Sequence, residues 1–158
     1  MAKRVYLDTN VYCRPLDDQT SHRVRSEARA FTLIADAALH QKIIIVSSDY
    51  VKFEIEKIAD PLKRKDIRGF ERALSSVNIT SSEELVALAT GFLSKCSLNS
   101  LDALHMSASC LGEADFLTCD DKISDEKDCI ENLAVERGYR LKVGNPVNYV
   151  KERRRGKR

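Results

Sequence analysis

Short apolar runs alternate along the chain with longer segments in which apolar residues recur every three or four positions. The short runs predict strands at residues 5–7, 43–46, 77–80, 116–118 and 140–143. The longer segments predict helices at residues 21–39, 49–59, 60–75, 81–95 and 101–111, with a partly helical stretch at 124–138. This alternation predicts an α/β fold, a three-layer sandwich with a mostly parallel central sheet.

The longest predicted helix, residues 21–39, has a clear division between its faces. Its small and apolar residues recur at helical spacing, and arginine and glutamate lie between them. The predicted core face is made of Val24, Ala28, Phe31, Ala35 and Ala38.

Length and composition predict one globular domain. The chain has 158 residues, of which 43% are hydrophobic and 32% charged. No apolar run approaches the roughly 20 residues of a membrane span, and the first residues lack the apolar stretch of a signal peptide. We therefore expect no membrane association and a cytoplasmic location.

The cysteines predict free thiols. There are five, an odd number, and no C-x-x-C pair is present. This pattern argues against a disulfide framework and against a structural zinc site.

Positive charge is concentrated at the C-terminal end. The net charge is +2, and residues 151–158 hold six basic residues and one acidic residue. We expect a body of residues 1–150 that is mildly acidic and a basic tail, 151–158, that is disordered. The tail either attracts phosphate backbones or is a solvated terminus with no specific role.

Four acidic residues lie beside apolar segments, where an unpaired carboxylate is costly. Asp8 and Asp120 each follow a predicted strand. Asp102 lies in an apolar helix, and Glu54 falls on the apolar stripe of another. In parallel sheets the functional crevice lies at the carboxyl ends of the strands, so the four acids predict one acidic pocket there. Such an all-oxygen pocket suits hard cations such as Mg²⁺ or Mn²⁺.

Polar neighbours can support these acids. Thr9, Asn10 and Thr118 supply hydroxyl and amide groups that can hydrogen-bond carboxylates or a metal-bound water. His105 lies three residues after Asp102, so it can touch that carboxylate and orient it.

Each acid also has an ordinary structural interpretation. Asp8 and Asp120 can be turn residues, Asp102 can stabilise a helix N-terminus, and Glu54 can reach water from the edge of its stripe. Asp121, adjacent to Asp120, is the second choice at that position.

Several short motifs, taken together, resemble those of PIN-domain proteins, the metal-dependent ribonuclease fold of VapC-type toxins. Residues 6–10 (YLDTN) resemble the first motif of that family, and residues 101–108 (LDALHMSA) resemble its third-acid helix. Residues 114–120 (ADFLTCD) are similar to its T-x-D strand end, and residues 142–146 (KVGNP) to its closing strand and Asn-Pro turn.

The resemblance implies a PIN-like nuclease domain over residues 1–150. It implies a quartet of metal ligands, Asp8, Glu54, Asp102 and Asp120, assisted by Thr118 and Asn10. It also implies a Mg²⁺- or Mn²⁺-dependent endoribonuclease that acts on RNA, the toxin of a toxin–antitoxin pair, with an antitoxin partner and a homodimeric state.

Three other classes are less favoured by the residues. The first is a PIN-like module that binds RNA or protein without cleaving it, and the intact acids disfavour it. A phosphotransfer receiver also gathers acids at strand ends, but Lys142 lies within a predicted strand instead of at its end. A phosphatase of the haloacid type needs a second aspartate two residues after Asp8, where this chain has Asn10.

Overall fold

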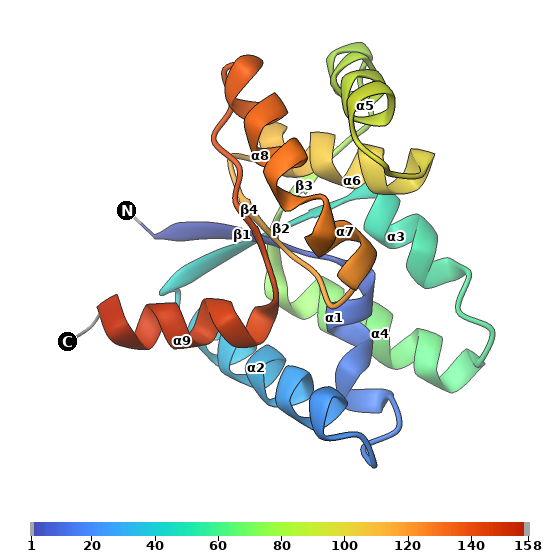
Figure 1. Cartoon of the computed structure of the whole chain (residues 1–158). Helices are drawn as coiled ribbons and strands as arrows, with labels where there is room; N and C mark the ends of the chain where they lie inside the picture. The colour runs from blue at the N-terminus through green and yellow to red at the C-terminus, as the bar shows by residue number, and fades with distance from the viewer. Residues whose placement is uncertain (1, 157–158) are drawn as a thin grey trace.

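A five-stranded parallel sheet between two layers of helices forms the computed structural model, which describes residues 2–156 (Figure 1). The strands are β1 (Lys3–Leu7), β2 (Ile43–Ser48), β3 (Ser75–Ile79), β4 (Asp115–Leu117) and β5 (Val143–Gly144). Their order across the sheet is β3-β2-β1-β4-β5, and every pairing is parallel. The predicted α/β three-layer sandwich is confirmed.

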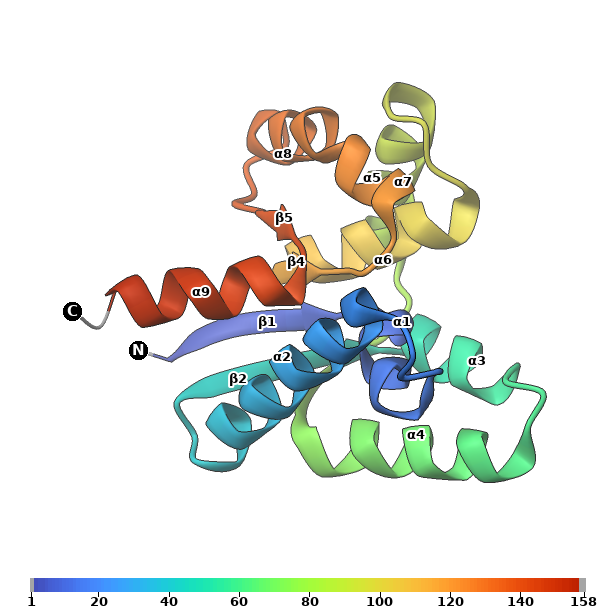
Figure 2. The same ribbon diagram turned by 60° about the horizontal axis from the view of Figure 1, so that its bottom comes forward.

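Helices cover both faces of the sheet (Figure 2). One layer holds α1 (Thr9–Cys13), α2 (His22–Leu39), α4 (Pro61–Leu74) and α9 (Pro146–Gly156). The other holds α5 (Glu83–Lys95), α6 (Ser100–Leu111), α7 (Asp121–Asp125) and α8 (Lys127–Glu136). The remaining helices are α3 (Asp49–Glu56) and the short 3-10 turn η1 (Arg14–Leu16). Within residues 2–156, no helix is long and apolar enough to cross a membrane.

The central strand explains why the fold is stable. Val5, Tyr6 and Leu7 of β1 are fully buried, because helices pack on both faces of this strand. Ile45 and Val46 of β2 are equally inaccessible. Such near-continuous apolar strands are typical of parallel sheets.

The carboxyl ends of the strands meet at one edge of the sheet. α1 follows β1 there, α3 follows β2 and α7 follows β4. α9 begins after β5 and runs back, so its end lies near the N-terminus at the opposite edge (Figure 1). The two edges of the sheet therefore have different chemistry, with the acids at one and the basic helix end at the other.

The prediction of a disordered tail is wrong for the residues that the structure describes, because α9 continues to Gly156. Arginine, lysine and glutamate are good helix formers, and positive charge is favoured at a helix C-terminus. Tyr149 is buried and α9 packs on α2, which anchors the helix to the body. Residues 157–158 lie outside the described part of the chain.

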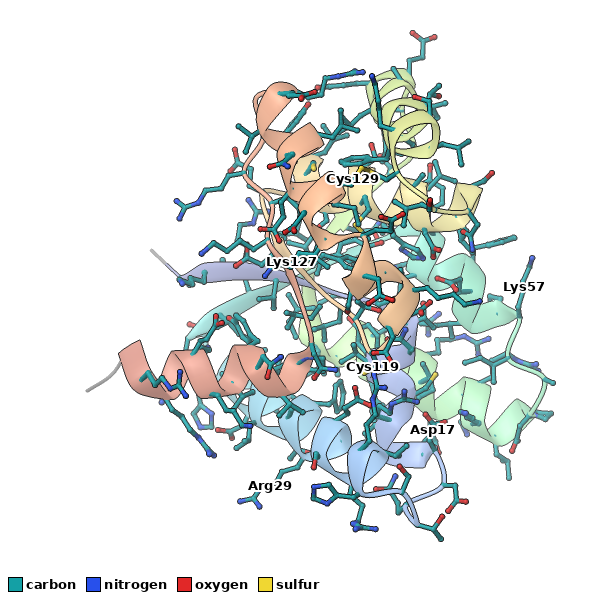
Figure 3. The ribbon with its side chains drawn as sticks, in the orientation of Figure 1. Asp17, Arg29, Lys57, Cys119, Lys127 and Cys129 are labelled. Atoms are coloured by element: carbon teal, nitrogen blue, oxygen red, sulfur yellow. A yellow bond between two sulfur atoms is a disulfide. The ribbon has the colours of Figure 1, made fainter. Side chains whose placement is uncertain are left out.

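The prediction of free thiols is wrong for two cysteines. Cys96, at the end of α5, and Cys129, in α8, form a disulfide with their Cα atoms 5.8 Å apart (Figure 3). The pair is separated by 33 residues and is brought together by the packing of α5 on α8, so no local spacing signals it. Cys13, Cys110 and Cys119 are free thiols, as predicted.

The last strand and the core face of α2 also differ from their predictions. β5 spans Val143–Gly144 instead of residues 140–143. The buried side chains of α2 are Glu27, Ala30, Phe31 and Ile34, so the core face is rotated from the predicted one and contains an acid. Glu27 is tolerated there because Arg14 and Arg23 pair with it.

Candidate acidic site at the carboxyl edge of the sheet

Asp8 lies immediately after β1 and is buried, with 6% of its surface exposed. Its side chain caps α1 by accepting a hydrogen bond from the Thr9 amide at 2.8 Å. The Thr118 hydroxyl donates to its other oxygen at 2.8 Å, and the Asn10 side-chain amide donates to the same oxygen at 3.1 Å. Burial raises the pKa of Asp8, and the positive charge of His105 and these hydrogen bonds only partly oppose it.

Thr118 and Asn10 link the loop after β1 to the loop after β4. The Thr118 oxygen accepts from the Asp120 backbone amide at 3.0 Å and from the Asn10 side-chain amide at 3.2 Å. The Asn10 side-chain carbonyl accepts from the backbone amide of Cys119 at 3.0 Å. The two predicted helper residues therefore fix the position of Asp120 relative to Asp8.

Glu54 reaches the same edge from α3. Its side chain is 29% exposed, and one oxygen, Oε1, accepts from the Thr9 hydroxyl at 3.1 Å and is hydrogen-bonded to His105 Nε2. Burial raises the pKa of Glu54, but the hydrogen bond and charge of His105 outweigh burial and lower it overall. The residue lies between core and solvent, which agrees with its place on the apolar stripe.

Asp102 lies in the first turn of α6, whose N-terminus is capped by the Asn99 side chain. Burial, followed by the negative charge of Asp8, raises the pKa of Asp102 to about 6. The positive charge of His105 opposes this rise, and the charges of Asp120 and Glu54 add to it, so Asp102 senses the other three acids. None of the main causes of this shift is a hydrogen bond to the carboxylate.

The two adjacent acids after β4 have different surroundings. Asp120 is half-buried and caps α7 by accepting from the Lys122 amide at 2.9 Å. Asp121 is 69% exposed and forms a two-fold ion pair with Arg23, with both N···O distances 2.7 Å. The geometry therefore groups Asp120 with the other acids and leaves Asp121 on the surface.

His105 supports a different acid from the one predicted. It is buried, with 1% exposed, and its Nε2 bonds Glu54, not Asp102, while its Nδ1 lies 2.7 Å from the Tyr6 hydroxyl. Burial lowers the pKa of His105, but the hydrogen bond to Glu54 and the charge of Asp8 raise it overall. The spacing along α6 places His105 one turn after Asp102. It could not indicate that the hydrogen-bond partner of His105 is Glu54, which lies on the neighbouring helix α3.

The donor set suits a hard divalent cation. Ligand atoms of Asp8, Glu54 and His105 lie within 4.8 Å of one another, but the His105 nitrogens are already bonded to Glu54 and Tyr6. The available donors are therefore carboxylate oxygens, which Mg²⁺ and Mn²⁺ prefer. The pKa of Asp102 is raised first by burial and then by the negative charge of Asp8, and a bound cation would favour the ionised form against both.

Sequence reasoning missed a second group of residues beside the acids. Glu27 accepts from Arg14 at 2.9 Å, from Arg23 at 3.4 Å and from the Asn145 side chain at 2.6 Å. Arg23 also donates to the Cys119 carbonyl at 2.9 Å. These bonds hold the segment that carries Asp120 against α2. Among these residues, only Asn145 had a signal in the sequence, the Asn-Pro turn. The positions of Glu27, Arg14 and Arg23 depend on packing between distant segments.

Most of the basic residues near this edge are paired with acids. Lys52 bonds the buried Glu71 at 2.7 Å, and Lys63 bonds Asp17 at 2.9 Å. Arg68 pairs with Glu56. Lys57 differs: its Nζ lies 4.1 Å from the ring centroid of Phe53, at the rim of the molecule after α3 (Figure 3).

Comparisons with known proteins agree with this architecture. The crystal structure of FitAcB from Neisseria gonorrhoeae superposes with a TM-score of 0.57 and 16% identity, covering 90% of this chain and 97% of that one. VapBC2 from Rickettsia felis, bound to a DNA fragment from their promoter, gives a TM-score of 0.55 and 15% identity, covering 89% of this chain and 98% of that one. Comparison with curated proteins gave no match.

The family assignment comes from the sequence. The family model for the PIN domain matches residues 5–127, which is most of the chain and includes all four acids at the carboxyl edge. PIN domains are generally nucleases that use divalent metals. This chain belongs to the PIN domain family.

Proposed function

We propose that this chain is a Mg²⁺- or Mn²⁺-dependent endoribonuclease that acts as the toxin of a toxin–antitoxin pair. The observation that carries the proposal is the meeting of four acids from four separate segments at the carboxyl edge of the sheet. Thr118 links Asp8 to the Asp120 backbone, Thr9 links Asp8 to Glu54, and Asp102 lies close enough for the charges of the other three to raise its pKa. Clustered carboxylates cost folding free energy unless a cation or a proton balances their charge, and such clusters are typical of functional sites.

The chemistry assigns distinct tasks to these residues. A bound divalent cation supplies a water acidified toward neutral pH and stabilises charge on the phosphate. Asp8, Glu54, Asp102 and Asp120 would hold the cation. Hydrogen bonds of Thr118 and Asn10 hold Asp8 and the loop of Asp120 in fixed positions relative to each other. Buried Asp8 is therefore fixed in one orientation, as an ordered ligand must be.

The likeness to FitAcB and VapBC2 supports the assignment to a toxin–antitoxin pair. We accordingly propose a protein antitoxin as partner, a homodimeric state and a cytoplasmic site of action. Expression of the chain in bacterial cells is expected to stop growth, and expression of the Asp8→Asn variant is not. Co-expression of an adjacent small reading frame is expected to restore growth.

RNA cleavage is the direct test of the proposed activity. The purified full chain is expected to cleave single-stranded or loop RNA internally in Mg²⁺ or Mn²⁺, and EDTA is expected to stop the reaction. A PIN-like module without catalysis would bind the same RNA in a gel-shift experiment and leave it intact with either metal. That outcome would replace the nuclease proposal by the binding-module alternative.

Phe53 and Lys57 are the residues that we propose to contact RNA at the rim. Phe53 is 50% exposed, and all nine other aromatic residues are buried or half-buried. The charge of Lys57 lowers the pKa of Glu54, so the pair lies close to the acids. An exposed ring beside a cation provides a stacking surface for a base and a contact for its phosphate.

The Phe53→Ala variant is therefore expected to bind single-stranded RNA about fivefold more weakly, the low end of the stacking range of about 1–3 kcal/mol per base. Lys57→Ala is expected to reduce the slope of log affinity against log salt by about 0.7. Fluorescence anisotropy with EDTA-treated protein measures both effects.

Matched controls are available elsewhere on the surface. Leu62 is 75% exposed and apolar but has no ring, and Lys42 is exposed at the opposite edge of the sheet. Leu62→Ala and Lys42→Ala are expected to leave RNA affinity and its salt slope unchanged. Losses equal to those of Phe53→Ala and Lys57→Ala would show that general surface charge and apolarity, not this rim, bind the RNA.

A further inference from the structure

A buried chain of hydrogen bonds runs from the N-terminus of α3 to Glu54 on the same helix. The Ser48 Oγ lies 2.5 Å from the Tyr6 hydroxyl, and that hydroxyl lies 2.7 Å from His105 Nδ1. The other ring nitrogen, Nε2, is hydrogen-bonded to Glu54 Oε1. Ser48 and Tyr6 are fully buried and His105 is 1% exposed, so water does not compete for these bonds.

The direction of the bond to Glu54 is the same in both protonation states of His105. In the neutral ring, Ser48 donates to Tyr6, Tyr6 donates to Nδ1, and the proton on Nε2 is donated to Glu54. In the charged ring, Nδ1 donates to Tyr6, Tyr6 donates to Ser48, and Nε2 still donates to Glu54. The Ser48 oxygen also accepts from the backbone amides that begin α3.

The same chain connects three segments that each carry one acid of the site. Tyr6 precedes Asp8 by two residues in β1, and Ser48 precedes Glu54 by six residues. His105 follows Asp102 by three residues in α6. One set of hydrogen bonds therefore joins β1, α3 and α6.

Both donors to Glu54 use the same oxygen. The Thr9 hydroxyl and His105 Nε2 bond Oε1, and the hydrogen bonds of the described residues leave Oε2 without a protein donor. Glutamate side chains lose considerable rotamer freedom when they are ordered. Here two protein hydrogen bonds to one carboxylate oxygen supply that ordering.

We propose that Ser48, Tyr6 and His105 are positioning residues that hold Glu54 with Oε2 directed to the cation before the cation binds. This inference rests on the proposed metal-dependent function and assigns His105 a role through Glu54 instead of direct ligation. Residues that orient a ligand in this way typically change metal affinity by about 10–100-fold when they are replaced.

Mn²⁺ titration calorimetry on the full chain tests the inference without using RNA. His105→Met, which keeps the side-chain volume but removes both nitrogens, is expected to raise the Mn²⁺ dissociation constant by about 10–100-fold. His105→Gln can present an amide N–H to Glu54, and its dissociation constant is expected to stay within about threefold of the parent's. Equal Mn²⁺ affinity in His105→Met and the parent would overturn the proposal.

A double-mutant cycle separates positioning from ligation. In a Glu54→Gln background, His105→Met is expected to cause no further loss of Mn²⁺ affinity, because its effect passes through Glu54. A histidine that bound the cation itself would add its full loss in that background, and that result would also overturn the proposal.

Tyr6→Phe tests the far end of the chain and keeps the buried ring. It is expected to weaken Mn²⁺ binding less than His105→Met does, with a circular dichroism spectrum like the parent's. If His105→Met fails to fold, an unchanged Mn²⁺ affinity in Tyr6→Phe is sufficient by itself to overturn the proposal. A parent that binds no Mn²⁺ overturns the proposed function as well, whereas a parent that binds Mn²⁺ and cleaves RNA isolates any failure to this inference.

Discussion

Asp8→Asn, Asp102→Asn and Asp120→Asn are each expected to lower the rate of RNA cleavage by about 1000-fold or more. A metal site contributes several kcal/mol of charge stabilisation in the transition state, and about 4 kcal/mol corresponds to that factor. Asparagine has nearly the size of aspartate and caps helices equally well, so the caps of α1 and α7 are kept. Single-turnover cleavage of a labelled RNA in Mn²⁺ measures the loss.

Asp121→Asn is the matched control, since Asp121 is adjacent to Asp120 but is held on the surface by Arg23. Exposed ion pairs contribute about 0.2–1 kcal/mol, so the change in cleavage rate is expected to be fivefold at most. A large loss in Asp121→Asn together with full activity in Asp120→Asn would mean that the second acid after β4 belongs to the site and the first does not.

Local sequence patterns predicted most of the elements because each pattern reports on its own segment. The apolar runs of β1 and β2 are buried on both faces. Asp60 caps α4, and Asn99 caps α6. β5 was misplaced because it has only two paired residues, and its place depends on its neighbour β4. The charge of the tail predicts disorder, whereas α9, which packs on α2, continues through the tail to Gly156.

The four acids could be selected from sequence because each breaks a local rule by standing next to an apolar segment. Their partners could not. The bonds of His105 to Tyr6 and Glu54 cross 99 and 51 residues, and Arg23 reaches Asp121 across 98. Glu27 does not belong to the predicted core face of α2, yet it is buried, because Arg14 and Arg23 pair with it.

Asp102→Asn is also expected to make the cation-free protein more stable. The folded pKa of Asp102 is raised from 3.8 to about 6, chiefly by burial and then by Asp8. Because this pKa is higher in the folded state, the protonated Asp102 side chain contributes its full stabilisation below about pH 4. That contribution is lost as the pH rises to about 6. At pH 7.5 the ionised carboxylate therefore costs folding free energy.

The size of this cost must be reduced for solvent screening, because Asp102 is only half-buried. We expect the ionised Asp102 to cost about 1–2 kcal/mol of folding free energy at pH 7.5 and almost none at pH 4. An acid in the first turn of α6 also interacts favourably with the helix dipole, which reduces this cost slightly. Asp102→Asn removes the cost, so its free energy of unfolding in EDTA should exceed that of the parent only above about pH 5.

Added Mn²⁺ should reverse the order of the two proteins. At 100 times its dissociation constant, the cation stabilises the parent by about 2.7 kcal/mol, and a variant that has lost a ligand gains much less. Urea unfolding of both proteins at pH 4 and pH 7.5, each with EDTA and with Mn²⁺, measures the free energies of unfolding that this prediction compares. A purely structural Asp102 would give a variant that is less stable than the parent at pH 7.5 in EDTA and that responds to Mn²⁺ as the parent does. Either of those results would count against Asp102 as a metal ligand, because a half-buried carboxylate that faces Asp8 and binds the cation predicts the opposite of both.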